Sequence, residues 1–559
     1  MTEQRWHKSY DPQVPHSLDY PDLDIHALVR RKADEVSGRP ALKFMGLTLT
    51  YGKLFERVDR LAAALAQRGI GQGDRVVLLM PNCPQFVISF YALMRLGATA
   101  VLANPLNVER ELVFKFKDSG AKALIVLDLL SQRVNNIKKQ VPLDLIVYTS
   151  LADFLPFPLN LLYPLKRRLD KSMPAVVIEK DARTVMLKDL LRVGGQPPSP
   201  AIDPQSMAVL IYSGGTTGVS KGIMLSHRAL VANASQVCAW GNLGGQDALL
   251  AVLPLFHGFG MSVCMNAPLS HGGTIILLPR FQAGEVCRTI NKEHPTLFAG
   301  VPTMFIAIKE LPDIDSYDLK SLRGIFVGAA PLPLAVMQEF SQRTGAALIE
   351  GYGLTEAVTA VACNPFQGQR KPGTIGIPFP DVEWKIVDLA DGQTEMPLGQ
   401  AGEIVLRGPD LMLGYLNLPD KTAETLRDGW LFTGDIGVMD EDGYITLVDR
   451  KKDLVIIGGF NVFPSEVDEV LHSHPQVAEA VAVGLPHPRK GEYLKAYVVP
   501  KAGQTIDPQE VIAFCQQNLT PYMVPREVEV RGELPKSMIG KVLRRSLREE
   551  EEAKWKAKG

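Results

Sequence analysis

Short apolar runs alternate with helical patterns along the first third of the chain, and this alternation restricts the fold more than any other feature. A helical spacing of apolar residues over Lys53–Ala66 precedes the buried-strand pattern Arg75–Met80, and a second helix is expected over Pro84–Leu96. Further strands are expected at Thr99–Ala103 and Ala123–Leu127. This succession of strand, helix and strand predicts right-handed parallel units whose helices flank the sheets.

The alternation returns over Ala208–Ile349 and then changes character twice. After about Gly376 the segments become strand-rich with tight turns, which is typical of an antiparallel subdomain. From Pro464 a mixed pattern resumes, with Ser465 as the expected N-cap of its first helix. We therefore expect an α/β protein: a large N-terminal domain of two helix-flanked β-sheet subdomains plus a β-rich subdomain, and a small mobile C-terminal α+β domain.

Composition limits the class of protein. At 559 residues, more than one domain is expected. The 60 basic and 61 acidic residues nearly balance, which argues against a general affinity for nucleic acid. The six cysteines lie too far apart for a metal knuckle and suit reduced core thiols. The polar N-terminus and the lack of an apolar stretch of roughly 18–20 residues predict a cytoplasmic protein without a signal peptide or membrane span.

The segment Tyr212–Gly222, YSGGTTGVSKG, follows the strand-like run Met207–Ile211. Small residues let backbone N–H groups approach a phosphate closely, hydroxyl groups add donors, and a lysine adds a cation. The segment is not a Walker A loop, because Ser220 precedes the lysine and no Ser or Thr follows it. A flexible surface linker is the alternative. The residues expected to bind phosphate are Ser213, Gly214, Gly215, Thr216, Thr217, Gly218 and Lys221.

Four further motifs follow in order along the chain. They are Gly351–Glu356 (GYGLTE), Gly429–Asp435 (GWLFTGD), Asp449–Asp453 (DRKKD) and Pro535–Lys541 (PKSMIGK). Together with the glycine-rich loop they resemble the adenylate-forming ligases, the superfamily of acyl-CoA synthetases, peptide-synthetase adenylation domains and luciferases. The resemblance extends over residues 51–545. It implies that ATP and Mg²⁺ activate a carboxylic acid to acyl-AMP with release of pyrophosphate, and that coenzyme A then accepts the acyl group.

The resemblance also implies roles for the nucleotide-binding residues. Tyr352 would stack on adenine, Thr355 would contact phosphate, and Glu356 would hold Mg²⁺ together with Thr216; oxygen ligands suit this hard ion. Asp435 would accept hydrogen bonds from the ribose hydroxyls, and Arg450 would add a nucleotide contact. Read alone, these residues would be an exposed turn and solvated surface charges. The adenine-binding wall would consist of Gly328, Ala329 and Ala330, with Gly351 and Gly353 completing the nucleotide site.

Catalysis and domain motion follow from the same resemblance. Lys541 would reach the acyl carboxylate and the α-phosphate, where a mobile cation stabilises developing negative charge. His257 would line the junction of the acyl, carboxylate and thiol sites, although a lone histidine among apolar residues is more often packed in a core. The predicted domains are residues 1–449 and 450–559, with a hinge near 449–453 at Lys452. The segment facing the thiol tunnel would be Gly458, Gly459 and Phe460.

Three details favour a long-chain fatty acid as substrate. Gly214 gives the loop a second glycine before its threonine pair, which resembles the loop of long-chain fatty acyl-CoA ligases. Gly459–Pro464 and the insertion Leu155–Leu169 also resemble that branch of the family. The favoured activity is therefore long-chain fatty acid–CoA ligase. The alternatives are a fatty acyl-AMP ligase that loads an acyl carrier protein, a CoA ligase for a medium-chain or aromatic acid, and a non-catalytic lipid-binding relative. Intact Lys541, Glu356 and Lys221 argue against the last.

The stretch Leu151–Met173 is apolar and aromatic, and a basic cluster lies at its end. Its prolines prevent a spanning helix. Two interpretations remain: a loop packed on the large domain, or peripheral contact of residues 154–171 with the inner face of a membrane, because apolar side chains beside cations suit an anionic bilayer. A homodimer is left open.

Overall fold

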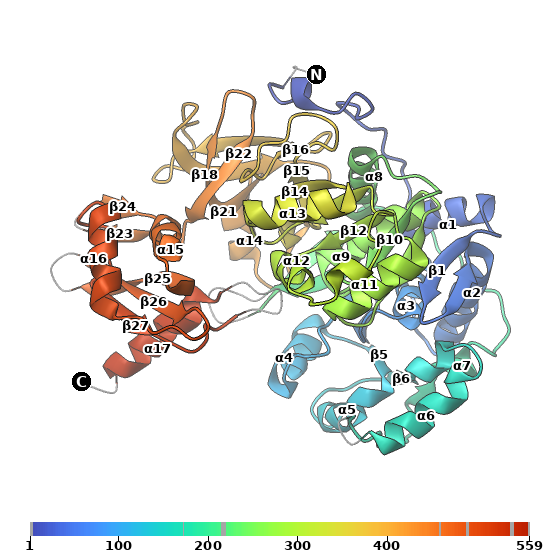
Figure 1. Ribbon diagram of the computed structural model, residues 1–559. Coiled ribbons are helices and arrows are strands. Elements are labelled where there is room, and N and C mark those ends of the chain that lie inside the picture. The colour runs from blue at the N-terminus through green and yellow to red at the C-terminus, as the bar shows by residue number, and fades with distance from the viewer. Residues whose placement is uncertain are drawn as a thin grey trace. The chain divides into compact units, whose positions relative to one another are not determined.

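The computed structural model describes residues 4–170, 173–213, 220–457, 460–487, 491–536 and 542–556 (Figure 1). The chain divides into two compact units. Unit 1 comprises Met1–Pro372, Gly376–Glu383 and Arg407–Leu431, and unit 2 comprises Gly373–Ile375, Trp384–Leu406 and Phe432–Gly559. The expected boundary at 449–453 lies inside unit 2, and the hinge at Lys452 stays a prediction.

An eight-stranded sheet forms one part of unit 1, in the order β19-β9-β8-β4-β3-β5-β6-β7. Its central strands run parallel and are buried on both faces, which explains why the sequence shows continuous apolar runs here. The strands are β3 (Arg75–Leu79), β4 (Thr99–Leu102), β5 (Ala123–Leu127), β6 (Leu145–Thr149), β7 (Thr184–Met186), β8 (Met207–Ser213), β9 (Lys221–Ser226) and β19 (Gly414–Tyr415). The associated helices are α2 (Tyr51–Ala66), α3 (Pro84–Arg95), α4 (Glu109–Ser119), η2 (Asp128–Leu130), α5 (Ser131–Ile137), η3 (Leu151–Phe154), α6 (Leu159–Leu169), α7 (Leu187–Leu190) and α14 (Pro419–Thr425).

A nine-stranded sheet forms the other part of unit 1, in the order β16-β15-β14-β13-β12-β10-β11-β1-β2. Phe298, Phe305 and Phe340 lie in its core with their rings in contact, and burying each such side chain contributes about 1.5–3 kcal/mol. The strands are β1 (Pro40–Phe44), β2 (Leu47–Thr50), β10 (Ala248–Ala251), β11 (Thr274–Leu277), β12 (Leu297–Gly300), β13 (Gly324–Val327), β14 (Ala347–Gly353), β15 (Ala360–Cys363) and β16 (Ile377–Pro378). The helices are η1 (His7–Ser9), α1 (Ile25–Glu35), α8 (His227–Gly241), α9 (Gly258–Met261), the π-turn η4 (Ser262–Asn266), α10 (Ala267–Ser270), α11 (Ala283–Glu293), α12 (Pro302–Lys309), η5 (Ile314–Ser316), α13 (Leu334–Thr344) and η6 (Thr355–Ala357).

Two five-stranded sheets follow toward the C-terminus. In the first, β17-β18-β21-β20 form a row and β22 also pairs with β21; in the second, β24-β23-β26-β25 form a row and β27 pairs with β26. The first contains β17 (Glu383–Val387), β18 (Ala401–Arg407), β20 (Leu426–Arg427), β21 (Trp430–Met439) and β22 (Ile445–Arg450). The second contains β23 (Val455–Ile457), β24 (Phe460–Val462), β25 (Val477–His487), β26 (Gly491–Pro500) and β27 (Glu527–Val530), with α15 (Pro464–Ser473), α16 (Pro508–Asn518) and α17 (Arg544–Lys556). The predicted α/β class, with helix-flanked sheets and a small C-terminal part, is confirmed.

Two local expectations were wrong. Ser465 is not an N-cap, because α15 begins one residue earlier and Phe463 occupies that position. The Ser465 backbone N–H instead donates to Asp449 Oδ2 at 2.9 Å, and its hydroxyl donates to the Val448 carbonyl. The second concerns α6, since a packed loop was one of the two interpretations of Leu151–Met173. A helix forms despite Pro164, and none of its residues is buried.

The cysteine expectation is confirmed, since all six thiols are buried and free of disulfides. Within the described residues, no helix is both long enough and apolar enough to cross a membrane.

Candidate active site

The glycine-rich segment connects two hydrogen-bonded strands rather than a strand and a helix. Strands β8 and β9 are antiparallel, and Ser213 lies opposite Lys221 in their register. Both residues therefore stand at the end of the hairpin where the connecting segment begins and ends. The predicted phosphate contacts between them lie outside the described residues: Gly214, Gly215, Thr216, Thr217 and Gly218.

The GYGLTE motif forms the end of β14 and the short turn η6. A Cβ atom on Gly353 would lie 1.6 Å from the Thr359 carbonyl oxygen, and one on Gly351 would lie 2.4 Å from Cys363 Sγ. Only glycine fits so close to backbone at Gly353, and a larger residue at Gly351 would have to displace the buried Cys363 side chain. The chain turns at Val358, whose φ of +59° is unfavourable for a β-branched residue. The two glycines therefore hold Tyr352 and Glu356 in one tight turn.

Residues of the expected adenine wall and His257 lie on loops that pack against this turn. A Cβ atom on Gly328 would lie 2.9 Å from the Phe259 ring, and Ala329 has a φ of +75°. His257 is exposed at the start of α9, where its Nδ1 accepts from the Phe259 N–H at 3.3 Å. A Cβ atom on Gly258 would lie 2.2 Å from the Val358 carbonyl oxygen. The packed-core interpretation of His257 is therefore wrong.

Glu356 is held by a segment that sequence reasoning missed. The Tyr415 hydroxyl donates to Glu356 Oε1 at 2.8 Å, and the Met412 N–H donates to the Glu356 carbonyl at 2.7 Å. Lys221 Nζ lies 4.7 Å from the centroid of the Tyr415 ring. The structure thus brings the end of the glycine-rich segment and the carboxylate of GYGLTE to the same tyrosine.

A fully buried carboxyl group, that of Asp410, lies two residues before Met412. Asp410 is fully buried, and desolvation raises its pKa to about 7. Asn233 Nδ2 donates to Asp410 Oδ2 at 3.1 Å and to the Ala360 carbonyl at 2.7 Å, and Ser262 Oγ donates to Asn233 Oδ1 at 2.6 Å. This network joins α8, η4 and the start of β15. It was not predicted, because Asp410 lies in a segment without a regular pattern.

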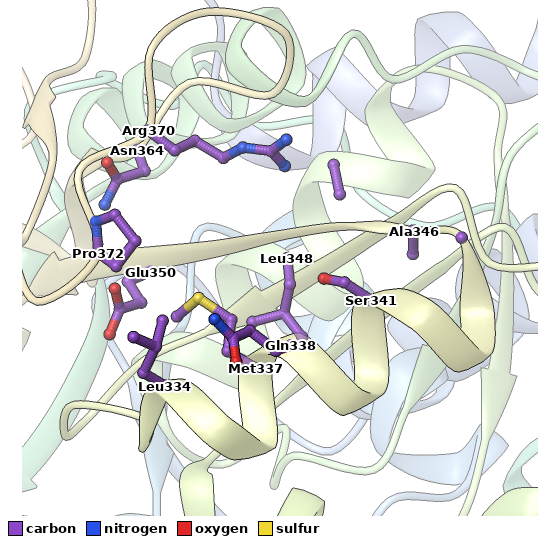
Figure 2. Close-up of a pocket in the computed structure, with 12 residues that line it drawn as sticks. Leu334, Met337, Gln338, Ser341, Ala346, Leu348, Glu350, Asn364, Arg370 and Pro372 are labelled. Atoms are coloured by element: carbon purple, nitrogen blue, oxygen red, sulfur yellow. The ribbon is translucent and has the colours of Figure 1, made fainter.

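A cavity of about 560 Å³ runs between α13, β14 and the loop that follows β15. Figure 2 shows Arg370 across this cavity from Met337 and Gln338 of α13. Glu350 lines one end, two residues before Tyr352 and therefore on the same face of β14. The Leu332 N–H approaches Glu350 Oε1 at 3.4 Å. Glu350 is a second residue that sequence reasoning missed; its only signal is an acidic residue in an otherwise apolar strand.

Unit 2 contains a separate pair of predicted nucleotide residues. Asp435 on β21 lies opposite Arg450 on β22, and Arg450 Nε is 2.8 Å from Asp435 Oδ1. The Asp435 side chain is only 6% exposed, whereas that of Arg450 is 42% exposed. The Thr433 hydroxyl accepts from the Asp435 N–H at 3.0 Å. The two residues predicted from separate motifs are thus in direct contact.

The remaining predicted residues of unit 2 are described only in part. Lys452 is exposed two residues after Arg450, and Phe460 begins β24 opposite Ile457. Gly458, Gly459 and Lys541 lie outside the described residues. The roles of these residues stay predictions.

The Glu356 carboxylate is an oxygen ligand of the kind that Mg²⁺ prefers. The described part of the chain contains no cluster of three His, Cys, Asp or Glu side chains suited to a metal. Mg²⁺ commonly binds proteins through one or two carboxylates together with phosphate oxygens and water. A single carboxylate such as that of Glu356 therefore fits this ion, provided that a nucleotide supplies the other ligands.

These features define a nucleotide-binding α/β protein, and comparison with known proteins places it in a family. The AMP-binding enzyme model matches residues 29–416, and the AMP-binding enzyme C-terminal domain model matches residues 466–541. The chain belongs to the AMP-binding enzyme family.

Individual relatives are similar over almost the whole chain. A long-chain-fatty-acid–CoA ligase of Bacillus subtilis (strain 168) is 40% identical over 556 residues, covering 99% of each chain. The crystal structure of ATP-bound MatB from Rhodopseudomonas palustris matches with a TM-score of 0.81 at 29% identity, covering 94% of this chain and 99% of MatB. The anthranilate CoA ligase AuaEII in complex with anthranoyl-AMP also gives 0.81, at 27% identity and 95% and 98% coverage.

Proposed function

We propose that this protein is a long-chain fatty acid–CoA ligase, which activates a fatty acid with ATP to acyl-AMP and transfers the acyl group to coenzyme A. The observation that carries the substrate class is the 40% identity, over 99% of both chains, to a protein of that name. The AMP-forming chemistry is supported by the family and by relatives solved with ATP or an acyl-AMP. Contact of Tyr415 with both Glu356 and Lys221 adds support from the site itself.

The proposed nucleotide site uses groups of unit 1 for the base and phosphates. Tyr352 would stack on adenine against the backbone of Gly328–Ala330, and Thr355 would contact phosphate. Glu356 and Thr216 would hold Mg²⁺, which would neutralise phosphate charge when bound. Lys221 and the hydroxyl and N–H groups of residues 213–218 would bind phosphate oxygens.

Groups of unit 2 would act on the sugar and in catalysis. Asp435 would accept hydrogen bonds from the ribose hydroxyls, with Arg450 fixing its carboxylate. Lys541 would stabilise the negative charge where the fatty acid carboxylate meets the α-phosphate. Lys452 would serve as the hinge of the small domain, and residues 458–460 would face the thiol. His257 in unit 1 would line the acyl and thiol junction.

The test is a substrate panel. Purified protein with ATP, Mg²⁺ and coenzyme A is offered acetate, octanoate, palmitate and benzoate, and AMP and thioester are measured together. Palmitoyl-CoA with an equal amount of AMP supports the proposal. An acyl-adenylate without thioester would instead indicate a carrier-protein acceptor, and preference for benzoate or octanoate would overturn the long-chain assignment.

We also propose that residues 154–171 contact an anionic lipid surface, at the inner face of the membrane of a cytoplasmic enzyme. The helix α6 lies at the rim of unit 1 (Figure 1). The segment has four basic residues and a single acidic one. Arg167 is paired with Asp128 at 2.7 Å and anchors the helix. The large exposed apolar side chains of this segment are Phe157, Leu159, Leu161, Leu162, Leu165 and Leu169.

Vesicle sedimentation tests this contact. The wild type should sediment with phosphatidylglycerol vesicles and much less with phosphatidylcholine, and Leu162→Glu/Leu165→Glu should remain in the supernatant. Leu398→Glu, at another exposed leucine, is the matched control and should sediment like the wild type. A variant that sediments normally would refute the lipid contact. If the wild type binds no vesicles and Leu162→Glu/Leu165→Glu loses dimerisation, the surface would instead contact a second copy of the chain.

A further inference from the structure

We infer that Tyr415 is a positioning residue for the nucleotide phosphates: its hydroxyl fixes the Glu356 carboxylate for Mg²⁺, and its ring fixes the Lys221 ammonium. This inference rests on the proposed ATP-dependent function. No sequence motif singled out Tyr415, and it lies 59 residues from Glu356 along the chain.

The backbone around Tyr415 is attached to the second strand of the hairpin. Tyr415 pairs with Ile223 in the β19–β9 register, and the N–H groups of Leu413 and Leu416 donate to the carbonyls of Met224 and Gly222 at 2.8 and 2.7 Å. The position of Tyr415 is therefore tied to that of Lys221, only two residues before Ile223.

Helix α14, which follows β19 in the chain, also holds this short strand. The Tyr415 N–H donates to Thr422 Oγ1 at 2.9 Å, and Thr422 Oγ1 donates to the Leu418 carbonyl at 3.0 Å. A Cβ atom on Gly414 would lie 2.7 Å from Thr422 Cγ2, so glycine is required for this approach. The side chain of Tyr415 thus projects from a backbone that is fixed on both sides.

The hydroxyl of Tyr415 acts on Glu356 as a neutral donor. The side chain is 5% exposed, and its 2.8 Å bond to Glu356 Oε1 is paralleled by the Met412 bond to the Glu356 backbone. A phenol is neutral at neutral pH, so the Tyr415 hydroxyl is available as a donor to the carboxylate. The hydroxyl orients the Glu356 carboxylate without cancelling its negative charge. A carboxylate that binds a metal ion needs to keep that charge.

The ring of Tyr415 acts on Lys221 through a cation–π contact. An ammonium 4.7 Å from the ring centroid lies within the attractive range of the aromatic face. The ring holds the cation without supplying a full counter-charge, so Lys221 remains able to neutralise a phosphate. One side chain therefore contacts both a cation and an anion that the proposed function assigns to the same ligand.

Binding of ATP to the full-length protein, measured by titration calorimetry with and without Mg²⁺, tests these two roles separately. Tyr415→Phe keeps the ring and removes the hydroxyl, so the gain in ATP affinity on adding Mg²⁺ should fall by about tenfold, the usual scale for loss of a group that orients a metal ligand. ATP affinity without Mg²⁺ should stay at the wild-type value. Tyr415→Leu also removes the ring and should weaken ATP binding in both conditions.

Tyr317→Phe is the matched control, because the Tyr317 hydroxyl donates to Asp313 Oδ2 at the same distance, 2.8 Å, on an exposed surface. It should leave both affinities unchanged. An unchanged Mg²⁺ gain in Tyr415→Phe would overturn the inference, as would equal loss in both conditions. If wild-type protein binds Mg·ATP and the variants behave as expected but no acyl-CoA forms, the inference survives and the proposed ligase activity fails.

Discussion

Glu356 in unit 1 and Asp435 in unit 2 are both carboxylates assigned to the nucleotide, yet they are held in opposite ways. Glu356 receives a hydrogen bond from the neutral Tyr415 hydroxyl, whereas Asp435 is paired with the Arg450 guanidinium at 2.8 Å. A neutral donor leaves the negative charge available for a metal ion, while a cation largely offsets it. Asp435 keeps acceptor oxygens in a defined geometry, which is what a ribose diol requires. Under the proposed function, charge would matter at Glu356 and hydrogen-bond geometry at Asp435.

The largest effect is expected where the backbone of unit 1 leaves no space. Gly353→Ala would place a Cβ atom 1.6 Å from a carbonyl oxygen and should displace the turn that carries Glu356, abolishing adenylation. Gly434→Ala, beside Asp435, meets no atom within 4 Å and is strained only by its φ of +70°. It should cost about 1 kcal/mol. The adenylation activity and the thermal unfolding of both variants should be measured. Equal losses in Gly353→Ala and Gly434→Ala would contradict the close packing at Gly353.

Removing the negative charge should lower activity more at Glu356 than at Asp435. Glu356→Gln should lower kcat/KM for acyl-AMP formation by about 10²–10³-fold, since an electrostatic group would be lost from the phosphate site. Glu356→Asp, which keeps the charge, is the control and should retain more activity than the glutamine variant. Full activity of Glu356→Gln over a range of Mg²⁺ concentrations would remove Glu356 from the metal site.

Asp435→Asn should have a smaller effect, because an amide retains one acceptor oxygen. We expect KM for ATP to rise by about fivefold, consistent with roughly 1 kcal/mol for one hydrogen bond. The same change should matter less with 2′-deoxy-ATP, because one ribose hydroxyl is already absent. An identical loss for both nucleotides would show that Asp435 acts elsewhere than on that hydroxyl.

Asp410 extends the comparison to a carboxyl group whose protonated form is favoured by burial. Burial raises its pKa from 3.8 to about 7, so the folded state favours its protonated form. Its stabilising contribution is complete below about pH 4 and is lost as pH rises toward 7. Relative to Asp410→Asn, the wild-type Tm should therefore fall by a few degrees between pH 5 and pH 8. Parallel Tm values across this range would contradict the shifted pKa.

The sequence was sufficient for the regular parts of the molecule. β5 was predicted with its observed ends, and α2 and α3 within two residues, because buried parallel strands and their covering helices have long apolar patterns. The sequence motifs identified both Asp435 and Arg450, but they did not predict that the two side chains are in contact. It depends on the register between β21 and β22, which no local pattern reports.

Other features depend on contacts between distant parts of the chain. β19 has only two residues, too few for a periodic signal, yet it places Tyr415 against Glu356 and Lys221. Ser465 has the chemistry of an N-cap, but Asp449 and the Val448 carbonyl from β22 take its hydrogen bonds. For α6 a packed loop was one of two interpretations left open, and the structure instead has a helix none of whose residues is buried.

The most direct test of the account is palmitate-dependent exchange of labelled pyrophosphate into ATP, measured without coenzyme A. This reaction reports reversible formation of acyl-AMP and no later step. The account predicts exchange that requires palmitate and Mg²⁺, is lost in Glu356→Gln, and gives way to palmitoyl-CoA when coenzyme A is added. Exchange that is independent of the fatty acid, or unaffected in Glu356→Gln, would contradict it.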